Sequence, residues 1–190
     1  MEIVRWLVRD ANCLGLDIVV VTGDFECTMV VEEILRCPSN NIIAVTGNVD
    51  HAGIRRALLD AGVLADGRTL SVKGLVMAGV GGMDPANSVR MLAKRIPSEG
   101  IDILLSHHPP HGILDITILG ARAGLWELKE LVDKLEPSAH LFGHIHESRG
   151  VERHGRTVFV NPGPLEQGFY AVISLEGGVA RATLGRLGSG

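Results

Sequence analysis

Five short polar signatures contain the residues of this sequence that are best suited to chemistry, and nearly all of them follow an apolar run of strand length. They are Gly23-Asp24, Gly47-Asn48-Val49-Asp50, Ser106-His107-His108-Pro109-Pro110, Gly143-His144-Ile145-His146 and Asn161-Pro162-Gly163. Carboxylate, amide and imidazole groups suit Mn²⁺, Zn²⁺ or Fe, and no thiolate is needed. Because a carboxylate can bridge two ions about 3.5–4 Å apart, this row of donors predicts a pair of divalent metals.

Taken alone, each signature has a plainer interpretation. Gly23-Asp24 and Gly47-Asn48 are ordinary turn sequences, and His107-His108 can be two solvated imidazoles in a rigid loop. The two His of Gly143–His146 are more specific, because in an extended segment they would face the same way. The hypothesis of a metal site therefore depends on the whole set and its order.

Apolar runs and helical periodicity place these signatures on alternating strands and helices. Strands are predicted at 17–22, 42–46, 75–80, 103–106 and 139–142, and helices at 2–14, 29–37, 50–62, 86–96 and 121–134. Four later segments, at 150–153, 157–161, 169–175 and 178–184, are predicted as antiparallel strands. The pattern predicts an α/β fold, a two-sheet β-sandwich flanked by helices in four layers, α/β/β/α. Ligands of such sheets gather outside the carboxyl ends of the strands.

Length and composition limit the class of protein. The 190 residues fit one domain, 1–190, with 46% hydrophobic and 21% charged residues. A net charge of −4 gives no basic surface for nucleic acid. Three cysteines without a CxxC pair suit a reducing compartment, so we expect a cytoplasmic protein. No apolar run is long enough to span a membrane, and charged residues interrupt any signal-peptide core.

The order of the signatures resembles the calcineurin-like metallophosphoesterase family, from about residue 15 to the end of the chain, and most closely its small single-domain phosphoesterases. The resemblance implies that Asp24 bridges two metals and that His146 binds the first. It further implies that Asn48, His107 and His144 bind the second metal. The implied metals are Mn, Zn, Fe or Ni. The implied reaction is hydrolysis of a small phosphodiester or phosphomonoester by a metal-bound hydroxide, with Asn48, His107 and Asp50 as catalytic candidates.

Two alternatives stay open for residues around these ligands. Asp50 can interact with the ligand residues without binding the metal itself, or it can cap the start of a helix. Val49 and Cys27 occupy positions where protein-phosphatase members carry a general-acid pair, so the resemblance does not extend to that branch. Protonation of the leaving group then falls to water or to one of three imidazoles, although a solvated rim position suits each imidazole better. These three are His51, His108 and His111.

The family's opening strand, which ends in Asp-x-His, has no counterpart here. The nearest segment, Asp10-Ala11-Asn12, lies on a predicted helix and has the wrong third residue. The first metal keeps only Asp24 and His146, so we expect it to bind weakly. We expect that Met1 is an internal start and that the first strand is missing; the alternative is a natural chain with one metal or none. An unpaired strand edge favours association, which leaves a homodimer open.

Two rival functions are considered. A non-catalytic binding or scaffold protein on the same fold fits the missing Asp-x-His but not the complete second set of ligands. A metal-dependent hydrolase of the β-lactamase type needs His-x-His-x-Asp-His, which Gly143–Ser148 does not supply. The remaining polar residues are expected to be structural: a satisfied core imidazole at His140, exposed side chains at His154, Arg55, Arg56 and Arg122, and a turn at Gly79–Gly82.

Overall fold

The computed structural model describes residues 4–5, 8, 15–37 and 41–187, and within them it has the predicted α/β architecture. A six-stranded mixed sheet has the order β3-β4-β5-β6-β8-β7. Its strands are β3 (Thr69–Val72), β4 (Leu75–Val80), β5 (Ile103–Ser106), β6 (Ala139–Leu141), β8 (Thr157–Asn161) and β7 (Gly150–His154). The four middle strands run parallel, and β3 and β7 close the two edges in the antiparallel sense.

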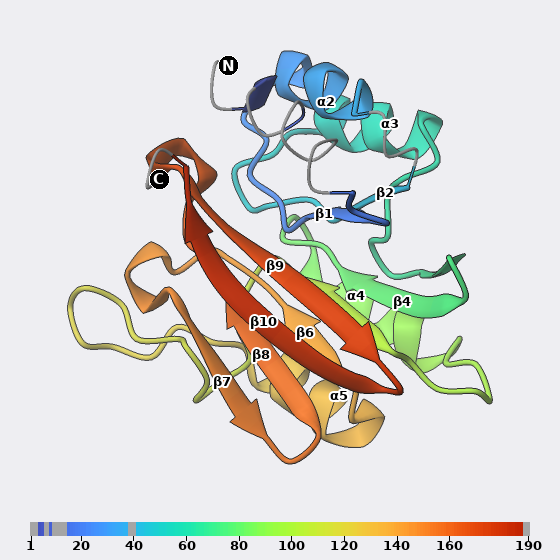
Figure 1. The fold of residues 1–190 in the computed structure, drawn as a ribbon, viewed down its shortest axis with the longest axis vertical. Coiled ribbons are helices and arrows are strands. Elements are labelled where there is room, and N and C mark those ends of the chain that lie inside the picture. The colour runs from blue at the N-terminus through green and yellow to red at the C-terminus, as the bar shows by residue number, and fades with distance from the viewer. Residues whose placement is uncertain (1–3, 6–7, 9–14, 38–40, 188–190) are drawn as a thin grey trace.

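A second layer of strands covers one face of this sheet (Figure 1). It consists of the parallel pair β1 (Val19–Val21) and β2 (Ile42–Ala44) and the antiparallel hairpin of β9 (Phe169–Glu176) and β10 (Val179–Arg186). Ile43 and Ala180 from this layer pack with Met77 and Leu105 from the larger sheet. The predicted second sheet of the sandwich is thus present as two separate two-stranded sheets.

Helices form the two outer layers. α2 (Thr28–Leu35) and α3 (Ala52–Asp60) pack on the outer side of β1 and β2, and α4 (Pro85–Ala93) and α5 (Trp126–Leu135) cover the other face of the large sheet. Two short 3₁₀ helices are η1 (His146–Ser148) and η2 (Leu165–Gln167). None of the helices in the described ranges is long and apolar enough to cross a bilayer.

Alternation along β1 and β2 explains why the strands lie between two layers. Ile42 and Ala44 face the core with α2 and α3, whereas Ile43 and Val45 face the core with the large sheet. Successive side chains of a strand point to opposite faces, so a continuous apolar run is buried on both.

The strand predictions are wrong in two places. The sequence pattern does not predict β3, because Thr69–Val72 is a short segment with a polar residue at every second position. It predicts β8 as antiparallel throughout, whereas β8 is antiparallel to β7 but parallel to β6. Local alternation indicates a strand but does not determine the direction of its second neighbour.

The helix predicted at 121–134 begins only at Trp126. Its expected first turn is extended, because the Leu125 amide donates to the Pro109 carbonyl at 2.9 Å. The Arg122 Nη1 donates to the fully buried Asp115 Oδ1 at 2.6 Å, so Arg122 is ion-paired and not simply solvated as predicted. Of the helix predicted at 2–14, the structure describes helical residues only at 4, 5 and 8; Asp10-Ala11-Asn12 lies outside the described residues.

Candidate metal centre

The predicted ligand residues lie just beyond the ends of four strands from two layers. Asp24 follows β1, Asn48 follows β2, His107 follows β5 and His144 follows β6. The two layers place these carboxyl ends on one rim, where ligands of α/β sheets gather. The fold thus brings residues far apart in sequence into one site.

His107 is the centre of this site and is only 2% exposed. Its Nδ1 lies 2.8 Å from the Thr22 carbonyl oxygen, which can only accept, so Nδ1 carries the hydrogen. Nε2 lies 2.7 Å from Asn48 Oδ1 and 3.5 Å from Asp24 Oδ1. In the neutral imidazole, Nε2 therefore presents a lone pair towards two oxygen acceptors. Three acceptor atoms directed at one another make a position that suits a cation.

His144 completes the group. Its ring centroid lies 5.0 Å from that of His107 and 4.4 Å from that of His108. Asp24 and His144 have backbone φ angles of 58° and 68°, a region that non-glycine residues seldom occupy. Such conformations cost about 1–3 kcal/mol each and persist where the surroundings enforce them. At these two positions the unusual backbone turns a ligand side chain into the rim.

The donor chemistry fits one divalent ion held by Asp24, Asn48, His107 and His144, because oxygen and imidazole donors suit Mn²⁺, Zn²⁺ or Fe. In the described ranges, no three His, Cys, Asp or Glu side chains are grouped to hold a metal, so Asp24, His107 and His144 do not by themselves form a metal site. The atoms that the structure does bring together are His107 Nε2, Asn48 Oδ1 and Asp24 Oδ1. His146 is exposed at the start of η1. Within the part of the chain described, no hydrogen bond or ion pair joins it to Asp24.

The three imidazoles considered as proton donors have different surroundings. Burial, with smaller effects of His107 and His144, lowers the pKa of His108 to about 3, so it is neutral and a poor donor near pH 7. His51 begins α3, where its Nδ1 accepts from the Gly53 amide at 3.1 Å. His111 stacks on Trp126 with ring centroids 3.8 Å apart.

Asp50 joins the loop that carries Asp24 to the loop that carries Asn48. Its Oδ1 accepts from the amides of Phe25 at 2.7 Å and Glu26 at 3.2 Å, and its Oδ2 accepts from the Gly47 amide at 2.7 Å. The side chain is 6% exposed. Since His51 caps the helix, the structure favours the supporting interpretation of Asp50 over the helix-start interpretation.

We expect Asp50→Asn to weaken binding of Mn²⁺ at the ligand cluster by about 10–100-fold, the usual effect of losing an outer-shell partner. The new amide group would meet backbone N–H donors in place of a carboxylate oxygen. Isothermal titration with Mn²⁺ measures the change. Asp84→Asn is the matched control, because Asp84 caps α4 through the Asn87 amide and Asn caps equally well. Equal Mn²⁺ affinity in both variants would contradict this role of Asp50.

Glycines permit the close approach of the ligand loops, a role that sequence reasoning missed. A Cβ on Gly47 would lie 1.9 Å from Asp24 Oδ1. A Cβ on Gly82 would lie 2.8 Å from both the backbone nitrogen of Asn48 and His107 Cδ2. The segment Gly79–Gly82, predicted only as a turn, therefore also packs directly against the ligand loops. The signal in the sequence was a glycine run directly after a strand, which also accompanies close backbone packing.

Asn161 explains the fifth signature. The side chain is fully buried; its Nδ2 donates to the Ile145 carbonyl at 2.8 Å and its Oδ1 accepts from the Gly163 amide at 3.0 Å. The turn between His144 and His146 is thus held in place by the end of β8. Asn161 positions the backbone of this ligand loop.

His140 is a core histidine with one partnered nitrogen. Its Nε2 lies 2.8 Å from Ser106 Oγ, which itself donates to the His108 carbonyl at 2.6 Å. No described group partners its Nδ1, so the prediction of a fully satisfied imidazole is only half right. Complete burial lowers the pKa of His140 to about 3.

This depressed pKa predicts loss of stability in mild acid. Below the ordinary pKa of 6.5 the unfolded chain binds a proton that folded His140 does not, so stability falls as the pH falls from about 6.5 towards 3. One such proton corresponds to a slope of about 1.4 kcal/mol per pH unit. Urea unfolding between pH 7 and 5 should show a shallower slope for His140→Gln than for wild type. His154→Gln is the control, because His154 is exposed; an unchanged slope in His140→Gln would contradict this source of acid sensitivity.

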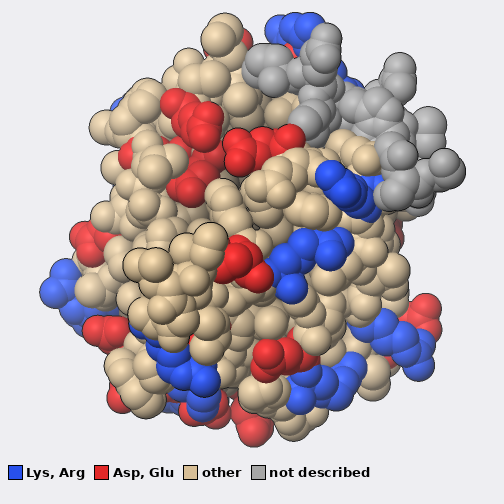
Figure 2. Space-filling view, turned by 90° about the vertical axis from the view of Figure 1, so that its left-hand side faces the viewer, with Lys and Arg blue, Asp and Glu red and all other residues tan. Residues whose placement is uncertain are grey.

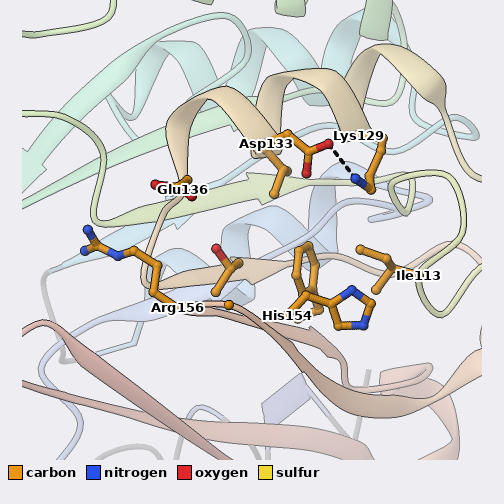
Figure 3. Close-up of a pocket in the computed structure, with 10 residues that line it drawn as sticks. Ile113, Lys129, Asp133, Glu136, His154 and Arg156 are labelled. Atoms are coloured by element: carbon orange, nitrogen blue, oxygen red, sulfur yellow. Dashed lines mark hydrogen bonds and ion pairs between the residues drawn. The ribbon is translucent and has the colours of Figure 1, made fainter.

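A cavity of about 300 Å³ lies away from the ligand cluster, between α5 and the β7–β8 turn (Figure 3). It opens near Thr157 at the start of β8, whereas the ligand rim lies beyond the end of that strand. Lys129 pairs with Asp133 across its edge, and Arg156 donates to Ser138. The cavity holds none of the predicted ligands.

Comparisons with known proteins agree with the fold and with the family that the sequence resembles. Residues 1–177 match the family described as the calcineurin-like phosphoesterase superfamily domain. Human metallophosphoesterase domain-containing protein 1 is 46% identical over 65 residues, 33% of this chain and 20% of that protein. A UPF0046 protein of Caenorhabditis elegans is 36% identical over 75 residues, 40% of this chain and 25% of that protein. The matches thus span a quarter or less of these relatives.

A solved structure shows the same fold over almost the whole chain. Protein TT1561 of Thermus thermophilus aligns with 97% of this chain and 92% of its own, with a TM-score of 0.72. The two sequences are 16% identical, so the likeness concerns the fold alone.

Proposed function

Because the chain belongs to the calcineurin-like phosphoesterase superfamily, we propose that it is a metal-dependent hydrolase of a small phosphodiester or phosphomonoester. The observation that carries the proposal is the convergence of His107 Nε2 with Asn48 Oδ1 at 2.7 Å and Asp24 Oδ1 at 3.5 Å. Oxygen and imidazole groups of this kind bind divalent metals, and the resemblance of the sequence signatures to the family assigns that role to each of these residues.

Each residue has a distinct task in this proposal. Asp24, Asn48, His107 and His144 hold the ion, and a bound divalent ion lowers the pKa of water and neutralises phosphoryl oxygens. The Thr22 carbonyl fixes the proton of His107 on Nδ1, which leaves Nε2 free as a ligand. Asn48 is exposed at the rim, so its amide can also hold a phosphoryl oxygen.

A further strand would supply the other ligands of a first metal, beside Asp24 and His146. The Val19 amide donates to the Asn41 carbonyl, and the Val21 carbonyl accepts from the Val45 amide, so both residues form hydrogen bonds on the β2 side of β1. The amide and carbonyl of Val20, which lies between them, therefore face the other edge of β1. The β9–β10 hairpin lies in the same layer as a separate sheet, which supports a position for a strand along this edge. An in-frame apolar run ending in Asp-x-His upstream of the Met1 codon is the expected result; an upstream stop codon without one contradicts it.

The proposed activity is tested with bis(4-nitrophenyl) phosphate and 4-nitrophenyl phosphate, with Mn²⁺, Zn²⁺, Fe²⁺ or Ni²⁺ added to chelator-treated protein at several pH values. We expect hydrolysis of at least one ester only after a metal is added. No metal-stimulated hydrolysis by any form of the chain, including one extended upstream, would overturn the proposal.

A non-catalytic binding or scaffold protein is the second candidate. It is supported by the exposed position of His146 and because Asp24, His107 and His144 do not by themselves form a metal site. Bound metal without hydrolysis of either ester would favour this candidate over an enzyme.

A further inference from the structure

Several large apolar side chains are exposed in the loops that follow the strands of the candidate metal centre. Ten large hydrophobic residues of the described chain are exposed; five of them lie between β2 and α3, between β4 and α4 or between β5 and α5, and a sixth, Trp126, is the first residue of α5. We call these six the apolar rim: Val49, Met83, Ile116, Ile118, Leu119 and Trp126. Single exposed apolar residues are normal, but several in the loops that carry or adjoin the ligand residues indicate a binding surface.

Two rim residues adjoin the ligands themselves. Val49 is 57% exposed, follows Asn48 and donates its backbone amide to Asp24 Oδ1 at 3.3 Å. Met83 is 40% exposed and follows Gly82, whose Cβ position would touch His107. Any ester bound at the ligand cluster would therefore have apolar neighbours on this side.

A small ordered hairpin carries the largest part of the apolar rim. Ile116 bridges Arg122, and the Gly120 amide donates to the Thr117 carbonyl at 2.8 Å. Ile118 and Leu119 at its tip are 86% and 90% exposed. The hairpin is the yellow loop that projects to the left in Figure 1, and Figure 2 looks onto this side, where uncharged atoms cover much of the surface.

This hairpin is attached to the ligand loop. The Ile118 amide donates to the Glu147 carboxylate, and Ser148 Oγ donates to the Ile116 carbonyl at 2.7 Å. Glu147 and Ser148 belong to η1, which begins at His146. The apolar tip is thus held in a fixed relation to the candidate metal centre.

Two arginines in the described loops near the apolar rim are engaged within the protein. In the described loops beyond the strands, Arg122 is engaged by Asp115 at 2.6 Å, and Arg149 stacks on Phe169 and donates to the Pro162 carbonyl. Glu147 adds an exposed negative charge beside the hairpin. Arg122 and Arg149 are therefore not free to bind further phosphates, whereas the apolar rim is open to an apolar group.

We infer that the substrate is a phosphate ester with an apolar alkyl or aryl part, which contacts the apolar rim. This inference rests on the proposed phosphoesterase function. The metal centre takes the phosphoryl group, and the apolar rim selects the organic group. Burial of apolar surface on binding provides the selectivity.

Two diesters with the same leaving group test the inference: 4-nitrophenyl methyl phosphate and 4-nitrophenyl octyl phosphate, the latter below its micellar concentration. We expect wild-type protein to favour the octyl ester in kcat/KM by on the order of tenfold. The double variant Ile118→Ser/Leu119→Ser should lose most of this ratio. Val172→Ser/Val179→Ser, at exposed positions of β9 and β10, is the matched control and should keep it.

The outcomes separate this inference from the proposed function. Hydrolysis of neither ester, and of neither bis(4-nitrophenyl) phosphate nor 4-nitrophenyl phosphate, would remove the proposed function itself. Hydrolysis of one of the latter two substrates, but of neither the methyl nor the octyl ester, would overturn the inference alone. Equal hydrolysis of both esters, or an unchanged ratio in the Ile118→Ser/Leu119→Ser variant, would overturn the inference alone. Sedimentation of both proteins adds a further outcome: a dimer that only the variant loses, with the ester ratio unchanged, would assign the apolar rim to a second copy and also overturn it.

Discussion

Replacing Asp24 by alanine is expected to lower metal-stimulated phosphoester hydrolysis by about a thousandfold, the scale at which removal of a central electrostatic group acts. Asp24 supplies the carboxylate nearest to His107, with Oδ1 3.5 Å from Nε2, and it also receives the Val49 amide. Without it, only neutral donors remain in the four-residue set. Steady-state kinetics with bis(4-nitrophenyl) phosphate at saturating Mn²⁺ measures the loss.

Asp60→Ala provides the control for this variant. Asp60 is exposed at the end of α3 and pairs with Arg56 on the helix surface, as expected for a solvated face, so its removal should leave the rate unchanged. The Asp24 variant should unfold at the wild-type temperature in metal-free buffer. Full activity of Asp24→Ala would remove Asp24 from the mechanism.

Adding one methyl group at Gly47 is expected to disrupt the ligand loops almost as severely. The Cβ would lie 1.9 Å from Asp24 Oδ1 and 2.2 Å from the Asp24 amide nitrogen, both shorter than any real contact. The loops must separate, so we expect Gly47→Ala to lose about 1–3 kcal/mol of stability, as overpacked sites do. We also expect Mn²⁺ affinity to fall by about 10–100-fold as the ligands move apart.

Gly53→Ala separates crowding at the ligand loops from a general effect of alanine. Its Cβ would meet only the flexible His51 ring, at 2.9 Å, and alanine suits its position in α3. Urea unfolding and Mn²⁺ titration are compared for both variants. Wild-type affinity in Gly47→Ala would show that the loops tolerate separation and that the geometry of the cluster is not essential.

Long apolar runs made the framework predictable. The bounds of β4 and β5 agree with the prediction residue for residue, because Leu75–Val80 and Ile103–Ser106 are apolar segments closed by polar or glycine residues. The position of Asp24, Asn48 and His107 on one rim followed from the rule that such strands present their carboxyl ends together. These features depend on local pattern and on general topology.

Interactions between distant segments were not predictable in the same way. Nothing near Arg122 indicates that buried Asp115 would hold it in an extended segment and delay α5 until Trp126. The need for glycine at positions 47 and 82 arises from the distance between separate strands, which a sequence does not display. The acid sensitivity expected from His140 likewise comes from complete burial in β6.

The number of ions bound by the 190-residue chain tests the central claim most directly. Chelator-treated protein is titrated with Mn²⁺ by calorimetry, and bound metal is counted by mass spectrometry after desalting. The proposed function predicts one tightly held ion per chain, lost in Asn48→Ala and in His107→Ala, with a second site weak or empty. Two fully occupied ions, or one ion bound equally well by both variants, would contradict a metal centre built on Asp24, Asn48, His107 and His144.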